Sequence, residues 1–185
     1  MKVISVRHKA DIIKGEYQFA DKVKREVLSL LKVCNPIPQG QSNVKASIHT
    51  EWDWEPDNIT FRNLKEYIRE EIEKCYKPGA TSGGGRRLLK CGNFWANVYK
   101  KGDYAQSHSH KPNDFSFAYF VKSKWYHPSL VFTDSGKRIR PKEGTFVAFP
   151  AYLMHHVPKN RYNDLRITLS GNLTIKRSSG IPIIT

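Results

Sequence analysis

The fold of this chain is decided by the stretch 94-FWANVYKKGDYAQSHSH-110. Aromatic and β-branched residues are frequent in its first six positions, which predicts a strand that ends before Gly102. A His-x-His pair, His108 and His110, closes the stretch. Side chains two positions apart on a strand point to the same face of its sheet. We therefore expect both imidazoles on one face of a β-sheet.

Short strands are predicted to follow at close spacing, with turn residues between them. Asp134-Ser135-Gly136 separates two strand-like segments and predicts a hairpin. Many short strands joined by turns are typical of an antiparallel jelly roll or barrel. The predicted strands that follow Gly102 cover residues 115–121, 130–133, 137–140, 145–149 and 166–173.

Two helices are predicted ahead of these strands. Between Gly15 and Cys34 apolar residues recur at three-and-four spacing, and Pro36 follows as a helix terminator. The second helix is expected from about Asn58 to Tyr76, with Asn58 or Thr60 as its N-cap. Its predicted apolar stripe is formed by Phe61, Leu64, Ile68, Ile72 and Cys75.

These patterns predict an α+β fold that is mainly β. A double-stranded β-helix, or jelly roll, is expected at its core, with the two N-terminal helices packed on it. At 185 residues and 21.3 kDa the chain fits a single domain over residues 1–185. Within that domain we expect a helical support region over residues 1–90 and a jelly-roll core over residues 91–175.

Two further segments are predicted as irregular. Trp52 and Trp54 flank Asp53 in a short extended piece. Packing is the expected role of the tryptophans, and the rim of a binding site is the alternative. Segment 79–87 contains three consecutive glycines before two arginines. It lacks the G-x4-G-K-[ST] pattern of a phosphate-binding loop, so a plain loop is expected.

The chain is strongly basic, with 31 Lys and Arg against 17 Asp and Glu and a formal charge of +14. The part that follows residue 90 carries 14 of the basic and only 5 of the acidic side chains. A positive field attracts anions, such as a dicarboxylate, a nucleotide or a nucleic-acid backbone. No block of five like charges occurs, so a basic nucleic-acid-binding arm is not expected.

Neither a membrane partner nor secretion is expected. No apolar run approaches the roughly 18 residues that span a membrane, and the first seven residues lack the apolar segment of a secretion signal. Cys34, Cys75 and Cys91 are odd in number and have no C-x-x-C spacing. They are expected to be free thiols in a reducing cytoplasm.

A metal site is predicted from the histidine pair and a third histidine, His155, which follows Phe149-Pro150. Coming from a distant strand, His155 would complete a triangle of imidazoles around one metal ion. Imidazole suits iron, copper, nickel and zinc, and Fe(II) is the metal that we expect. Asp114 is the nearest spare carboxylate and is the alternative to His110 as third ligand.

Four polar residues are predicted to face the same cavity. Asn97 and Tyr99 share one face of the first strand, and Arg166 and Thr168 share one face of the last. A guanidinium is a bidentate receptor for a carboxylate, to which Asn and Tyr add neutral hydrogen bonds. A metal ion with a remote carboxylate clamp fits a 2-oxo acid, which chelates the metal through its oxo-carboxylate end.

The segments Trp95 to His110, 149-FPAYLMH-155 and 166-RIT-168 resemble the Fe(II)/2-oxoglutarate-dependent dioxygenase superfamily. The resemblance is closest to short phage-type oxygenases, which show an H-x-H, an F-P-x-x-L-x-H and an R-I-S/T. It covers roughly residues 94–173. The N-x-Y that begins at Asn97 is also similar to the nucleic-acid demethylases of the alkylation-repair group. A phage origin would place the protein in the cytoplasm of the host.

This resemblance implies that His108 and His155 bind Fe(II) and that Arg166 holds the distal carboxylate of 2-oxoglutarate. The implied reaction uses O2, releases succinate and CO2, and hydroxylates a C–H bond of a substrate. Most members have Asp or Glu where this chain has His110, so the chain departs from the 2-His-1-carboxylate pattern. The residues implied to assist the arginine are Asn97, Tyr99 and Thr168.

Two other functions remain open. The spacings Gly102-x5-His108-x-His110 and Gly144-x5-Pro150 also resemble the cupins, metal-binding jelly rolls in which 2-oxoglutarate has no required role. The second alternative is a basic nucleic-acid-binding module that would use aromatic residues such as Trp125 and Tyr126. The sequence names neither the oligomeric state nor the substrate, for which a small molecule, a peptide and a nucleic acid are all open.

Overall fold

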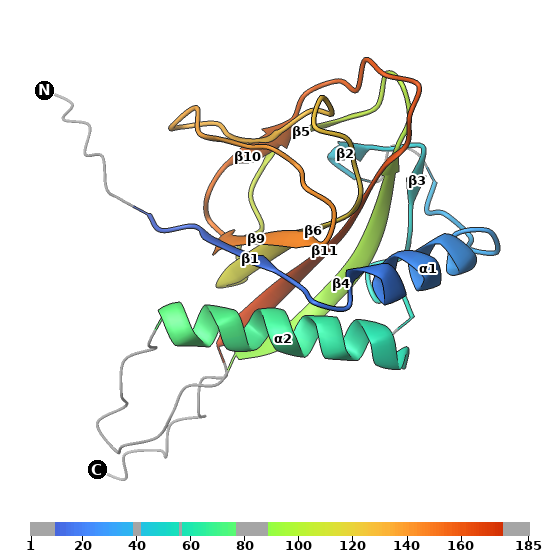
Figure 1. Cartoon of the computed structure of the whole chain (residues 1–185). Coiled ribbons are helices and arrows are strands. Elements are labelled where there is room, and N and C mark those ends of the chain that lie inside the picture. The colour runs from blue at the N-terminus through green and yellow to red at the C-terminus, as the bar shows by residue number, and fades with distance from the viewer. Residues whose placement is uncertain (1–9, 39–41, 56, 77–88, 176–185) are drawn as a thin grey trace, which may run out of the picture.

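The computed structural model describes residues 10–38, 42–55, 57–76 and 89–175. Two antiparallel sheets face each other, and two helices cover the outer side of the larger sheet (Figure 1). The glycine-rich segment 79–87, for which a loop was predicted, lies outside the described residues. The elements are β1 (Ile13–Glu16), α1 (Ala20–Leu30), β2 (Val44–Lys45), β3 (Ile48–His49), α2 (Ile59–Cys75), β4 (Leu89–Tyr99), β5 (Tyr104–His108), β6 (Phe115–Lys122), β7 (Leu130–Phe132), β8 (Arg138–Ile139), β9 (Thr145–Pro150), β10 (His155–Val157) and β11 (Arg166–Ile175).

The larger sheet has the strand order β1-β9-β6-β11-β4-β3, and the smaller sheet has the order β2-β5-β10-β7-β8. Every pair of neighbouring strands in the two sheets is antiparallel. The predicted hairpin is confirmed, because β7 and β8 pair directly. Two facing antiparallel sheets with helices on one side confirm the predicted double-stranded β-helix. Neither described helix has the length and apolar character needed to cross a membrane.

Strands β6 and β9 send alternate side chains into two different cores. Phe117 and Phe146 pack on the helical side of the larger sheet. Phe120 and Phe149 point the other way and pack between the two sheets. This alternation follows from the two-residue period of a strand. Burial of each phenylalanine contributes about 1.5–3 kcal/mol, so both faces of the larger sheet stabilise the fold.

Helix α2 confirms the second predicted helix. Its N-cap is Asn58, whose Oδ1 accepts the backbone N–H groups of Thr60 at 3.0 Å and Phe61 at 3.3 Å. The predicted stripe is buried except for Cys75, which is exposed because the helix ends there and no further turn continues the buried face. The buried members of the stripe are Phe61, Leu64, Ile68 and Ile72.

The first helix is shorter than predicted. Its expected start, Gly15, lies in β1 and pairs with Phe146 of β9. A Cβ at Gly15 would lie 2.3 Å from the Phe146 ring, so only glycine allows the strand to pack this closely. Strand pairing therefore prevails over the helical spacing up to Glu16, and α1 begins only at Ala20.

Strands β1, β2 and β3 were not predicted from the sequence. β2 pairs with β5, and β3 places His49 beside Asn97 of β4. These short strands lie within the first 90 residues and extend both sheets. They bring the loop around residues 42–55 against the strands that carry the predicted site.

Candidate metal centre

Three histidines meet where β5 and β10 lie side by side. His108 ends β5 and is the direct cross-strand partner of His155, the first residue of β10. His110 lies just after β5, where its backbone N–H donates to the Ala151 carbonyl at 2.8 Å. One ligand nitrogen from each of the three imidazoles lies within 4.8 Å of the others. The structure thus brings together the three predicted histidines.

The expected placement of the pair on one strand is wrong for His110. β5 ends at His108, and His110 beyond it bonds through its backbone to Ala151, which precedes β10. The backbone hydrogen bond to Ala151 aims the His110 ring back at His155, and the two ring planes are 26° apart with centroids 5.0 Å apart. The backbone contact with Ala151 therefore holds the His110 ring beside His155, although β5 has already ended.

The hydrogen bonds of two rings leave their Nε2 atoms facing the centre of the cluster. Nδ1 of His108 lies 2.7 Å from the Gln106 carbonyl, and Nδ1 of His155 lies 2.9 Å from the Leu153 carbonyl. Because a carbonyl only accepts, each Nδ1 carries the proton and donates it, which leaves Nε2 with a free lone pair. Such a carbonyl partner is common for a metal-binding histidine.

The spacing of the rings suits one ion. Nε2 of His110 lies 3.2 Å from Nε2 of His155. Two ligands that each lie about 2.0–2.1 Å from an ion and at right angles to each other are about 3 Å apart. In the metal-free protein, a His110 Nε2–H can donate to the His155 lone pair, and a metal ion can take the place of that proton.

Burial keeps the three imidazoles uncharged. Burial, assisted by the imidazoles of His155 and His108, lowers the pKa of His110 to about 3. Burial and His108 lower the pKa of His155 to about 4, and burial lowers the pKa of His108 as well. At neutral pH each ring therefore offers a lone pair, which is the form that binds a metal.

The alternative ligand Asp114 is engaged elsewhere. Its Oδ2 accepts the backbone N–H of Ile175 at 2.7 Å, and its backbone carbonyl accepts the N–H of Ala151 at 2.9 Å. The converging group of described ligands contains the three histidines and not Asp114. The carboxylate holds the end of β11, so the geometry favours His110 as the third ligand.

The four predicted polar residues lie together at the other end of the same cavity. Antiparallel pairing of β4 with β11 sets Tyr99 opposite Arg166 and Asn97 opposite Thr168. All four side chains are buried, and they line one cavity with the three histidines. The shared face that alternation predicted is therefore present, because the two strands pair in register along this segment.

Arg166 is the most unusual of these residues, since only 1% of its surface is exposed. Its guanidinium lies 4.8 Å from the centre of the Tyr99 ring and 5.7 Å from that of Phe120. Nε and Nη1 of Arg166 and Oδ1 of Asn97 have no hydrogen-bond partner among the described residues. A buried cation with unpaired donors is costly, so this end of the cavity is suited to an anion.

Burial also shifts the ionisation of the arginine and its neighbour. It lowers the pKa of Arg166, which the adjacent Tyr99 partly offsets. It raises the pKa of Tyr99, against the opposing effect of Arg166. Tyr99 therefore stays a neutral phenol that can donate a hydrogen bond to the same anion.

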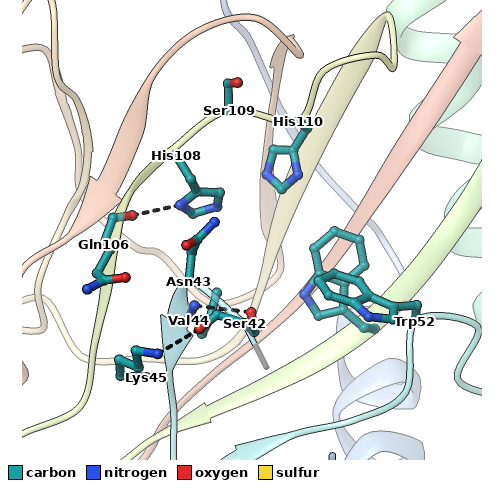
Figure 2. A pocket seen from close by; sticks show the side chains of 10 residues that line it. Ser42, Asn43, Val44, Lys45, Trp52, Gln106, His108, Ser109 and His110 are labelled. Atoms are coloured by element: carbon teal, nitrogen blue, oxygen red, sulfur yellow. Dashed lines mark hydrogen bonds between the residues drawn. The ribbon is translucent and has the colours of Figure 1, made fainter. Parts of the chain in front are cut away.

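A second and larger cavity, the mouth cavity, opens in front of His108 and His110 with a volume of about 410 Å³. Residues 42–45 and Gln106 supply a polar wall, and Trp52 supplies an aromatic wall. Figure 2 shows Trp52 on one side and Gln106 on the other, with the two histidines between them. Gln106, in β5, was missed in the sequence, because no local pattern marks an exposed strand residue as part of a site.

The two tryptophans of the short extended piece have different roles. The predicted packing role is confirmed for Trp54, which is buried against Phe61 with ring centroids 5.3 Å apart. Trp52 is 41% exposed and lines the mouth cavity. The alternative role, the rim of a binding site, therefore fits Trp52.

Comparison by sequence finds no relative, since no protein-family model and no curated protein sequence matches the chain. Comparison by structure finds many. The 2-oxoglutarate complex of the viral collagen prolyl hydroxylase from Paramecium Bursaria Chlorella virus-1 matches with a TM-score of 0.61 and 14% identity. That match covers 88% of this chain and 94% of the viral enzyme.

Two further solved structures extend this likeness. A prolyl-4-hydroxylase of Pseudomonas putida has a TM-score of 0.61 and 15% identity, over 90% of this chain and 93% of that enzyme. SnoN, a non-heme alpha-ketoglutarate-dependent epimerase from nogalamycin biosynthesis, has a TM-score of 0.70 and 12% identity, over 92% of this chain and 80% of SnoN. At such identities the likeness establishes the fold. The chain therefore has the double-stranded β-helix fold of the 2-oxoglutarate-dependent oxygenases.

Proposed function

We propose that this protein is an Fe(II)- and 2-oxoglutarate-dependent oxygenase that hydroxylates a C–H bond. One observation carries the proposal: a buried guanidinium with unpaired donors shares a cavity with three converging imidazoles. The metal end matches the donors that iron accepts, and the arginine end matches a carboxylate. A molecule that needs both ends is a 2-oxo acid with a second carboxylate.

Each residue has a role in this proposal. His108, His110 and His155 would hold Fe(II), and Arg166 would bind the distal carboxylate of 2-oxoglutarate through its free Nε and Nη1. When bound, iron with 2-oxoglutarate and O2 supplies the oxidative decarboxylation that yields succinate, CO2 and an oxidised substrate. The neighbours that would add neutral hydrogen bonds to the same carboxylate are Asn97, Tyr99 and Thr168.

The all-histidine ligand set changes the charge of the site. Three neutral imidazoles leave the full charge on the ion, whereas the usual carboxylate ligand would offset one unit. A dianionic co-substrate such as 2-oxoglutarate therefore gains additional attraction to this metal, and Arg166 adds a further positive charge at the far end. The chain itself places no carboxylate among the described residues that line this cavity.

The proposal is tested by anaerobic titration of Fe(II) into the protein with and without 2-oxoglutarate, followed by visible absorption. We expect a metal-to-ligand charge-transfer band that requires both components and is lost in Arg166→Ala and in His108→Ala. Arg138→Ala removes an exposed arginine of β8 and serves as the matched control that keeps the band. If the protein does not bind iron, the proposal of an iron-dependent enzyme is contradicted, and a basic nucleic-acid-binding module becomes the better explanation of the site and the charge.

A second candidate function is a cupin-type metal protein, or a dioxygenase that does not use 2-oxoglutarate. The all-histidine ligand set and the engagement of Asp114 with Ile175 favour it, because both depart from the 2-His-1-carboxylate pattern. Iron binding without a band would support this candidate. A cupin-type function would leave the unpaired donors of Arg166 without a role, and we therefore prefer the oxygenase.

Membership of the short phage-type group is supported by the quoted motifs alone. A cytoplasmic location is supported by three cysteines that are free in the structure, Cys34, Cys75 and Cys91.

A further inference from the structure

The mouth cavity has the size and position of a substrate site. Its volume of about 410 Å³ falls within the range of pockets that bind small molecules, roughly 300–1,000 Å³. His108 and His110 form part of its wall, so a molecule bound there would lie beside the proposed metal. The chemistry of the remaining walls then indicates which class of molecule fits.

One wall is a fixed aromatic surface. The Trp52 ring is held by near-perpendicular contacts with His49 and Trp95, at centroid distances of 4.8 and 4.7 Å. Part of the Trp52 ring remains exposed, which leaves room for a planar group to stack. Trp95 is buried and lines the same cavity, and its indole N–H has no hydrogen-bond partner in the part of the chain that the structure describes.

The opposite wall offers hydrogen bonds and a positive charge. Asn43 and Gln106 present exposed amide side chains, and Lys45 donates from Nζ to the Ser42 carbonyl at 3.0 Å. No Asp or Glu is among the described residues that line the cavity. Figure 2 shows Lys45 and Gln106 across the cavity from Trp52. Such walls favour a ligand that combines a flat ring, polar edges and a negative charge.

We propose that the mouth cavity binds a nucleotide as the substrate. The base stacks on Trp52, the amides of Asn43 and Gln106 bond to its polar edges, and Lys45 meets the phosphate. Stacking on tryptophan accepts any base, and an ammonium group suits a phosphate as a point charge. A proline-containing peptide could fill the aromatic wall and bond to the amides through its backbone, but it carries no phosphate for Lys45. This inference rests on the proposed function, since it names the substrate class of the same site.

The test measures binding to protein loaded with Ni(II) and 2-oxoglutarate, so that no turnover is needed. Thymidine 5′-monophosphate is titrated by calorimetry, and a short fluorescein-labelled oligothymidylate is titrated by anisotropy. Binding of the mononucleotide alone would identify a free nucleotide as the substrate, and binding of the oligomer alone would identify a nucleotide within a single strand. A proline-containing peptide is titrated in parallel.

Three variants locate the bound ligand. We expect Trp52→Ala to weaken binding about tenfold or more, and Trp52→Phe to restore most of it, which shows that loss of folding is not the cause. Lys45→Gln should weaken binding and reduce its salt dependence. The matched control is Trp125→Ala, because Trp125 is 76% exposed and lies outside the lining of the cavity.

Three outcomes would overturn the inference. They are failure of both nucleotide ligands to bind, binding that depends on Trp125 and not on Trp52, and Trp52-dependent binding of the peptide in place of the nucleotides. The charge-transfer band of the wild-type protein separates this test from that of the proposed function. If the charge-transfer band forms but no nucleotide binds, the proposed substrate class is refuted and the oxygenase stands. If a nucleotide binds but no band forms, the proposed oxygenase activity is refuted and the binding site stands.

Discussion

The two ends of the site are built in opposite ways. At the arginine end, the side chains come from paired residues of the central strands β4 and β11, and all are buried. At the mouth, the wall comes from the two-residue strand β2, from the loop that holds Trp52, and from exposed side chains such as Gln106. Strand pairing therefore fixes the end that would hold the co-substrate, whereas the mouth can vary without disturbing the core.

The strongest test of this comparison is Arg166→Met, which should have opposite effects on binding and on stability. Loss of the guanidinium should weaken binding of 2-oxoglutarate about 100-fold or more, because a buried charge pair is lost. Without ligand, the variant should be more stable than wild type by about 1–4 kcal/mol, because a buried cation with unpaired donors is replaced by an apolar side chain. Calorimetry and urea unfolding measure the two effects.

The exposed Arg138 provides the control, and Arg138→Met should change neither quantity. If Arg166→Met destabilises the ligand-free protein, the guanidinium stabilises the fold by itself. The arginine end would then be part of the structural core, and its proposed role as a site for an anionic ligand would lose its support.

At the histidine end, His110→Ala and Asp114→Asn distinguish the two possible third ligands. The first should weaken Ni(II) binding at least about tenfold, since it removes a converging nitrogen. Asp114→Asn should change the affinity for Ni(II) by no more than about twofold, because the amide oxygen of the new side chain can still accept the Ile175 N–H in place of the carboxylate. Competition with a chromogenic chelator measures both. The reverse ranking would make Asp114 the ligand and would move the metal toward the end of β11.

The smallest effect is expected for Tyr99→Phe, which removes a hydroxyl from the arginine end. Affinity for 2-oxoglutarate should fall about 3- to 10-fold, as expected for one hydrogen bond. Burial raises the pKa of Tyr99, so the folded protein keeps a proton that the unfolded chain loses above about pH 10. Stability should therefore fall as pH rises above that value, and less steeply in the variant.

Urea unfolding between about pH 9 and 11 measures this difference. Tyr162→Phe removes a hydroxyl from an exposed tyrosine and serves as the matched control substitution. Equal slopes for Tyr99→Phe and wild type would show that Tyr99 ionises freely, and that the arginine end is more open to water than its burial indicates.

Most of the arginine end could be predicted from the sequence because strand alternation is a local rule. Asn97, Tyr99, Arg166 and Thr168 needed only the two-residue period and the correct pairing of two long strands. The Asn58 cap of α2 was likewise visible, since a cap and its helix are adjacent in the chain.

The mouth could not be predicted in the same way. β2 and β3 are two residues long and exist only because β5 and β4 offer free edges, which no window of sequence reveals. The apolar spacing alone predicted a helix from Gly15. That prediction was wrong because Gly15 pairs with Phe146 of β9, and a strand so far along the chain does not enter the local pattern. His110 lies beyond the end of β5 and is held beside Ala151 by a backbone hydrogen bond, a contact that the H-x-H pattern does not encode.

The direct pairing of His108 with His155 has a consequence for local motion. An ion held by both rings would cross-link β5 to β10 at the first residue of a strand only three residues long. So short a strand has few backbone hydrogen bonds of its own and belongs to the least protected parts of a fold. Chelation of the ion should therefore speed amide hydrogen exchange in β10 before that in β4 or β11, so that the smaller sheet opens while the larger one stays closed.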